Sequence, residues 1–505
     1  MNKFKQKFTS YLKGRNFPSA VLTAIVIAVV VFVNVIIYTL STVFPLYVYS
    51  PEEDDLSISE ASDALFEKYI SDGYRVTVTF CSYEDQVASH STGKFVYETA
   101  REFEKRYPGF ITLRFINAIT KLDSNGNSVA EELEIFSDGG RNAINDTSVI
   151  FSTDTGYRVL TDNYSGSGYV DFYTLDDSLY ITSYNGEEVF ASSILWALTE
   201  THGTAYMTVG HGETANGTLY NILTAAGYEV KELNLRKNDV PEDAELVIIS
   251  NPISDFERGA EGSSLITEYD RLCRYRDRGG SFMVFFDPTV KTLRVLEGFV
   301  AEFGISFATI SDGERMIVKD SVNAITTDGF TLVADYADSP VASDMKSAIS
   351  ERTGDSDGRV IIRNVASLIL DGGARPVLVS SSSSVCEAGG ATVDREGGYT
   401  IAAYSSMAND LADDSVMFVM SDGMLTASDA IVTDGYSNKD FLYSLFDNLF
   451  DKGDMPYGCR SIVYDQQILE NLTMGTAKTY TAVLIAIPAI LAVVGGVVLV
   501  RRKNR

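Results

Sequence analysis

The sequence predicts an α/β protein, and three observations support this fold class. A short apolar run, Ala205–Val209, ends in a glycine turn and is followed by an amphipathic segment of helical period. Further strand-like and helix-like segments then alternate as far as residue 303. Two long uncharged apolar runs lie near the ends of the chain. The alternation favours a mainly parallel sheet, and the terminal runs predict two transmembrane helices that flank it.

The central strand is followed by Gly210-His211-Gly212-Glu213, where two glycines allow a tight turn with positive φ. The next segment, Thr218–Ala226, has its apolar residues on one face and ends at Gly227, as a helix does. After it the sequence predicts three strands (228–233, 245–250 and 282–286) and two helices (265–278 and 290–303).

Flanking regions have weaker patterns. Before the central strand, helical and strand-like runs alternate, and they resemble a small thioredoxin-like β-α-β layer without its redox cysteines. These runs are 57–72 and 95–107 as helices, and 74–80 and 110–116 as strands. Beyond residue 303, a mixed Asp-, Gly- and Ser-rich region precedes one further strand, 416–420, and one helix, 440–450.

The charge of the chain is strongly negative and unevenly distributed. The chain has 41 Lys and Arg against 69 Asp and Glu, a formal net charge of −28. Residues 1–44 and 479–505 carry basic residues and no acidic ones, so the acidic excess lies in 45–478. Because this surface repels phosphate backbones, we expect no nucleic-acid partner.

The two apolar runs, 19–44 and 479–500, are each long enough to cross a bilayer. Basic residues lie on the terminal side of each run, so the positive-inside rule predicts a plasma-membrane protein with both termini cytoplasmic and residues 45–478 extracytoplasmic. A cleaved signal peptide or buried helices are the alternatives.

These patterns divide the chain into eight parts. The predicted parts are a basic cytoplasmic N-terminus (1–18), the first transmembrane helix (19–44), a small thioredoxin-like α/β domain (45–146), a strand-rich connector with a helix (147–200), the main α/β domain (201–460), a juxtamembrane segment (461–478), the second transmembrane helix (479–500) and a basic cytoplasmic tail (501–505).

Known catalytic patterns do not match the sequence. The four cysteines, Cys81, Cys273, Cys386 and Cys459, lack CxxC spacing, and they are interpreted as buried thiols or as two disulfides. There is no GxSxG nucleophile elbow and no GxxxxGK[ST] nucleotide loop. The sequence therefore assigns no catalytic, cofactor-binding or metal-binding residue.

A candidate crevice for a ligand or partner comes from residues that follow the predicted strands. Because parallel strands bring their carboxyl ends to one edge, these residues are expected to lie close together. The alternative is that they are turn and cap residues, which Asn-Pro, Asp-Pro and Asp-Gly pairs often are. The candidates are Gly210, His211, Gly212, Glu213, Asn251, Asp287 and Asp422.

Several stretches, taken in order, resemble the Gld-G-like auxiliary proteins of ABC-type transport systems, the gliding-motility-associated family. Two of them are Gly186-Glu187-Glu188 at the start of a helix and the Gly210–Glu213 turn described above. The others are PEDAELVIISNP at 241–252, FMVFFDP at 282–288, SVMFVMSDGML at 415–425 and Ser437-Asn438-Lys439-Asp440-Phe441, followed by an apolar segment and a basic tail.

The resemblance implies a glutamine-amidotransferase-like α/β domain beside an ABC permease and its cytoplasmic ATPase, and it implies no catalytic residue. We therefore expect a non-catalytic, membrane-anchored auxiliary subunit of an ABC-type transport or motility system. The alternatives are a membrane-anchored cell-wall or glycan hydrolase that uses Glu213, Asp287 and Asp422, and an extracytoplasmic cation- or solute-binding sensor.

Overall fold

The computed structural model describes residues 56–463, except 141, 162–167, 176–180, 215–216, 261–264, 410–412, 424 and 427–434. All of these described residues belong to one compact unit, Glu53–Arg505. The other unit, Met1–Glu52, lies outside them.

The predicted placement as a two-pass plasma-membrane protein is corrected here. Within the described part of the chain, no helix is both long enough and apolar enough to cross a membrane. Its longer helices, such as α5 (Gly93–Arg106), have 14 residues, roughly 21 Å, against a hydrocarbon core of about 30 Å. The segments on which the prediction was based, 19–44 and 479–500, lie outside the described residues. The assignment of cytoplasmic termini and an extracytoplasmic 45–478 is not retained.

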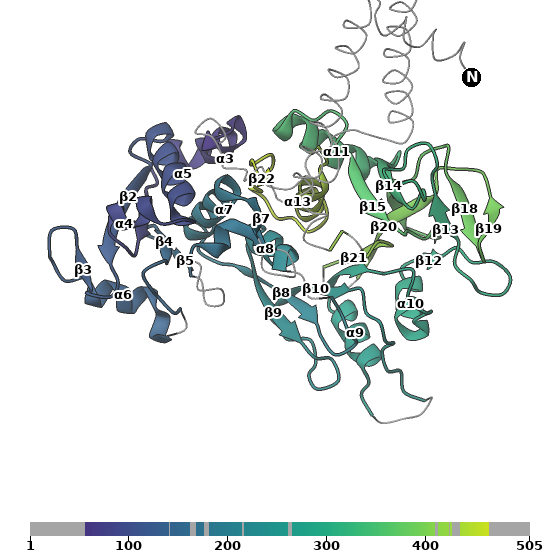
Figure 1. The fold of residues 1–505 in the computed structure, drawn as a ribbon. Coiled ribbons are helices and arrows are strands. Elements are labelled where there is room, and N and C mark those ends of the chain that lie inside the picture. The colour runs from purple at the N-terminus through teal and green to yellow at the C-terminus, as the bar shows by residue number, and fades with distance from the viewer. Residues whose placement is uncertain are drawn as a thin grey trace, which may run out of the picture. The chain divides into compact units, whose positions relative to one another are not determined.

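A nine-stranded sheet forms the larger part of the described structure (Figure 1). Five neighbouring strands are parallel to one another, which confirms the parallel pairing predicted for the central region. The other four pair antiparallel, so the sheet is mixed. In sheet order the strands are β15 (Val360–Arg363), β14 (Thr331–Tyr336), β17 (Arg375–Val379), β20 (Thr400–Met407), β21 (Ser415–Met420), β11 (Ser281–Phe285), β10 (Ala244–Ser250), β8 (Gly203–Thr208) and β9 (Tyr228–Leu233).

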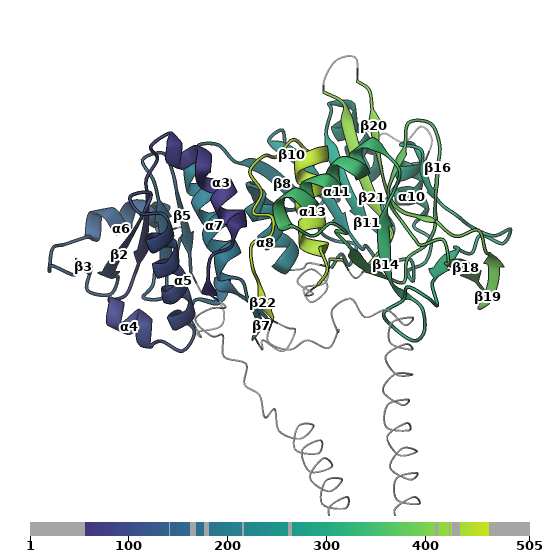
Figure 2. The same cartoon turned by 90° about the horizontal axis from the view of Figure 1, so that it is seen from above.

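Helices cover both faces of this sheet because the parallel strands are apolar on both sides. Along β10, Leu246 and Ile248 pack in one core, whereas Val247 and Ile249 pack in the other. The first core receives α8 (Gly217–Ala225), α11 (Pro340–Thr353) and α13 (Asn438–Leu449), and the second receives α9 (Glu268–Asp277) and α10 (Arg294–Ala301). The two groups lie on opposite sides of the sheet in Figure 1, and Figure 2 looks onto α11 and α13.

The five-stranded sheet contains the predicted β-α-β unit. Its central strand β1 pairs parallel with β2, and α5 lies in the connection between them. β4 and β5 extend this sheet antiparallel, although their residues fall in the predicted connector 147–200. The strand order is β3 (Leu122–Asp123), β2 (Ile111–Asn117), β1 (Val76–Phe80), β4 (Val149–Ser152) and β5 (Tyr157–Leu160). Helices α3 (Glu60–Ser71), α5 and α7 (Gly186–Leu198) share one core with it, and α6 (Ala130–Phe136) packs in another.

Three smaller sheets complete the fold. One of them brings the end of the described chain back to earlier residues, because β22 pairs antiparallel with β7 and Ile462 and Cys459 join the α7 core. The sheets are β22 (Ile462–Val463), β7 (Ile181–Tyr184) and β6 (Tyr173–Leu175); β13 (Ile317–Lys319), β18 (Val385–Ala388) and β19 (Ala391–Asp394); and β12 (Ile305–Phe307) with β16 (Leu368–Leu370).

All four cysteines are free thiols, and only Cys273 is partly exposed. Burial raises the pKa of the Cys81 and Cys386 thiols to about 12, so both are neutral near pH 7. The sequence did not decide between free thiols and disulfides, and in the structure all four cysteines are free thiols.

Candidate functional site

The candidate residues lie along one edge of the nine-stranded sheet. Strands β21, β11, β10 and β8 are neighbours and parallel, and each is followed by one or more of the candidates. The chain passes from β8 to β9 on one side and then returns to β10 on the other, so the switch point of the sheet lies between β8 and β10. At such a switch point α/β proteins usually have their ligand crevice.

At this switch point the two loops bind each other. The backbone N–H of Thr214 donates to the Ser250 carbonyl at 3.0 Å, and that of Ile253 donates to the His211 carbonyl at 2.9 Å. Gly210 and Gly212 have φ of 120° and 75°, as the predicted glycine turn requires. A Cβ atom on Gly212 would lie 2.4 Å from Ile253 Cγ1. The two loops are therefore held against each other at the position where a ligand would be expected.

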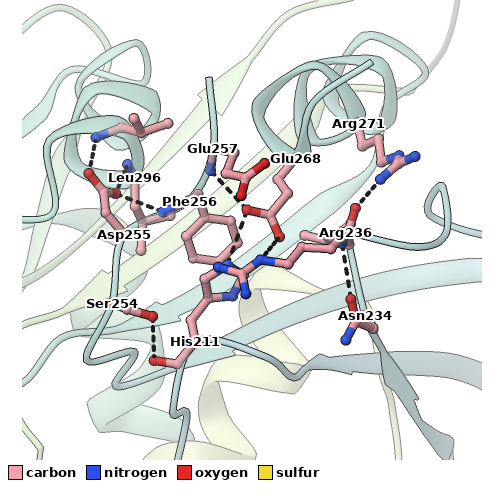
Figure 3. Close-up of polar contacts among 12 residues, drawn as sticks. His211, Asn234, Arg236, Ser254, Asp255, Phe256, Glu257, Glu268, Arg271 and Leu296 are labelled. Carbon is pink, nitrogen blue, oxygen red and sulfur yellow. Dashed lines mark hydrogen bonds and ion pairs between the residues drawn. The ribbon is translucent and has the colours of Figure 1, made fainter. Parts of the chain in front are cut away.

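His211 lies at the centre of a buried ionic cluster (Figure 3). Its Nδ1 is 3.2 Å from Glu213 Oε1, and its Nε2 is 3.1 Å from Glu268 Oε2. The three side chains are 1%, 5% and 2% exposed. The imidazole also stacks on Phe256, with ring centroids 4.1 Å apart and planes 13° apart. Both ring nitrogens are thus occupied by carboxylates of the same chain.

The cluster favours the charged form of the imidazole. Burial opposes that form, but the hydrogen bond to Glu213 and the negative charge of Glu268 outweigh it, so the pKa of His211 is raised. Burial likewise opposes ionisation of Glu213, yet hydrogen bonds from the side chain and backbone of His211 lower its pKa. A protonated His211 donates from both nitrogens, one to each carboxylate.

Glu268 is the member of the cluster that the sequence analysis missed. It is the first residue of α9, and Thr267 and Asp270 form a capping box around it. The backbone N–H of Glu257 donates to its Oε2 at 2.8 Å, and Arg236 Nε lies 3.6 Å from its Oε1. The Thr-x-x-Asp pattern identifies the helix start, but it does not indicate which strand end that helix start faces.

The other three candidates have separate structural roles. Asn251 has a left-handed φ of 50°, and its Nδ2 donates to Thr426 Oγ1 at 2.8 Å. Asp287 Oδ1 accepts from the N–H and Oγ1 of Thr289, at 2.8 and 2.7 Å, and so closes its own turn. Asp422 is fully buried and accepts from the Arg363 N–H at 3.2 Å.

These contacts favour turn and cap roles over one shared pocket. Over the described residues, no group of three or more His, Cys, Asp and Glu side chains is placed to hold a metal ion.

The Gly186-Glu187-Glu188 stretch joins segments that are distant in sequence. A Cβ atom on Gly186 would lie 2.1 Å from the Tyr184 hydroxyl, so any larger residue would require the Tyr184 ring to move. Glu187 accepts from the Ser59 and Ser62 hydroxyls, at 2.6 and 2.8 Å. Glu188 pairs with Lys439 at 2.8 Å and also accepts from the Tyr443 hydroxyl. This stretch therefore ties α3 and α13 to α7.

Comparisons with known proteins give no family. No family model matches the chain, and no curated protein matches it.

Several solved structures are similar over about half of the chain. The mmIFT52 N-terminal domain is 14% identical with a TM-score of 0.36, over 50% of this chain and 99% of that domain. A putative ThuA-like protein from Bacteroides uniformis is 11% identical with a TM-score of 0.30, over 48% and 89%. A glutamine amidotransferase from Thermotoga maritima is 12% identical with a TM-score of 0.25, over 51% and 87%. Similarity at this level supports no conclusion about function, and the α/β fold is established by the strand pairing itself.

Proposed function

We propose that this chain is a non-catalytic auxiliary subunit of an ABC-type transport system and that it binds the permease and the ATPase of that system. In this proposal the nine-stranded region is glutamine-amidotransferase-like and the five-stranded region is thioredoxin-like, and neither region keeps a catalytic site.

The His211 cluster is the observation that supports a non-catalytic role. A general acid or base must offer a proton or a lone pair to a substrate, and a metal ligand must offer a lone pair to the ion. Both nitrogens of His211 are instead within hydrogen-bond distance of Glu213 and Glu268, and the ring is 1% exposed. This side chain acts as an internal tie between the β8 loop and α9.

Support for the partner comes from the family resemblance and from a contact between two of its stretches. Glu188 of the Gly-Glu-Glu stretch pairs with Lys439 of the Ser437–Phe441 stretch, 251 residues along the chain. The sequence has no nucleotide-binding loop of its own. In this proposal the energy for transport comes from ATP hydrolysis by the partner ATPase that the resemblance implies.

The test is to purify the tagged full-length chain from the cells that encode it, under gentle detergent, and to quantify co-purifying proteins by mass spectrometry. We expect a multi-span permease and an ATPase in amounts comparable to the chain, and equal recovery with the Glu213→Gln and Asp287→Asn variants. Recovery of the chain alone would overturn the proposal. Glycan hydrolysis by the wild type that Glu213→Gln abolishes would support the hydrolase alternative instead.

A further inference from the structure

A cavity of about 340 Å³ opens beside α10, at the same edge of the sheet as the His211 cluster but next to β11 and β21. Phe286, which follows β11, and Phe307, in β12, contribute aromatic walls, and Leu368 and Val419 contribute aliphatic ones. Figure 1 shows α10 beside β12. The volume falls in the range of small-molecule pockets, about 300–1,000 Å³, and mainly apolar walls are typical of them.

Gly298 is one of the residues that line this cavity. It lies in the middle of α10, and a Cβ atom built on it meets no atom within 4 Å. A helix-interior glycine is less favourable than alanine by about 1 kcal/mol. Among the described residues no atom crowds this position, so steric contact with a Cβ atom does not require glycine here.

The charged side chains that line the cavity are Arg294 and Glu297. Arg315, 7% exposed, donates to Glu297 Oε1 at 2.6 Å and neutralises it. Arg315 is held in turn by the Val290 carbonyl at 2.8 Å and lies over the Phe307 ring. Arg294 is exposed and lines the cavity, and it has no hydrogen-bond or ion-pair partner among the described residues. It is thus the lining charge that is left uncompensated.

We infer that this cavity binds a small carboxylate with an aromatic or short aliphatic body. The body lies between Phe286 and Phe307 over the space left by Gly298, and the carboxylate pairs with Arg294 at the rim. Thr292, Ser306 and Thr309 also line the cavity, and each carries a hydroxyl that can hydrogen-bond a carboxylate. This site is independent of the proposed transporter partnership.

The experiment titrates the full-length protein with three probes that share one body, 4-phenylbutyrate, 4-phenylbutyramide and 4-phenylbutylamine, by ligand-observed NMR. We expect saturable binding, with affinity that decreases from the carboxylate to the amide to the amine. Arg294→Gln should weaken binding of the carboxylate about threefold to fivefold, the range of an exposed ion pair, and leave binding of the amide unchanged.

Gly298→Leu should abolish binding of all probes. The matched control is Gly217→Leu, also at a helical glycine with no atom within 4 Å of the built Cβ, and it should bind as the wild type does. Circular dichroism checks that each variant is folded. Absence of saturable binding at millimolar probe, equal binding of the amine, or unchanged binding in Gly298→Leu would each overturn the inference. Arg294 is exposed, so its variant keeps the test valid even if Gly298→Leu unfolds.

Discussion

Two regions along the carboxyl edge of the central sheet differ in whether their charged side chains are buried and paired or exposed and unpaired. At the switch point between β8 and β10, His211, Glu213 and Glu268 are almost fully buried and pair with each other. Beside α10, Arg294 is exposed and no described residue pairs with it, and a Cβ atom built on Gly298 meets no atom within 4 Å.

The difference has a physical cause. A charge removed from water must be paired inside the protein, whereas an exposed one is solvated and remains available. The position of the switch point in the sheet is therefore not sufficient to identify a ligand site. At the expected crevice the two loops bind each other, whereas a cavity lies beside α10.

We expect the largest effect on stability from Glu268→Gln, in the buried cluster. This change leaves the buried His211 with one carboxylate, and loss of one partner of a buried pair costs about 3 kcal/mol. We expect the free energy of unfolding, measured by urea denaturation, to fall by that amount. Glu229→Gln is the matched control, because Glu229 is 53% exposed and pairs with Lys231 at 3.3 Å. It should change stability by less than about 1 kcal/mol. Equal effects of the two variants would contradict the account of the cluster.

A second prediction compares Gly212, in the loop after β8, with Gly298, in α10. Gly212→Ala should destabilise the protein by about 2 kcal/mol, because φ is 75° and the new Cβ meets Ile253. Gly298→Ala should stabilise it by about 0.5–1 kcal/mol, because the helix favours alanine and the added methyl group has room. Thermal denaturation by calorimetry measures both. A loss of stability in Gly298→Ala would mean that the space beside α10 is already filled.

The smallest effect concerns pH. Because the folded pKa of His211 is raised, its stabilising contribution is complete below the unfolded value of about 6.5 and is lost as the pH rises through the folded pKa. Because the pKa of Glu213 is lowered, its contribution is present above about 4.5 and is lost as the pH falls through the folded pKa. The groups that face the ring are Glu213 and Glu268, with Arg236 behind Glu268.

The stability difference between the wild type and His211→Gln should therefore be largest between about pH 5 and 6.5 and decrease at higher pH. Urea denaturation across this range measures it. A difference that stays constant up to pH 9 would show that His211 is already neutral.

The sequence alone was sufficient for features that depend on neighbouring residues. Apolar runs bounded by glycine or proline turns predicted β8, β10 and β11, and their alternation with helices predicted parallel pairing. That pairing was enough to predict that His211, Asn251, Asp287 and Asp422 follow adjacent strands. The prediction of two membrane-spanning helices, in contrast, relied on segments that lie outside the described residues, and it is corrected by the helices that are described.

Only the tertiary structure decided which distant groups meet. No local pattern pairs His211 with Glu268, 57 residues away, or Glu188 with Lys439, 251 residues away. The antiparallel strands β14, β15, β17 and β20 show little alternation of apolar and polar residues, because consecutive residues in them are buried. Side-chain pairing and register depend on packing between segments, and packing is a property of the folded chain. For the same reason only the fold places Arg294 and Gly298 around one cavity.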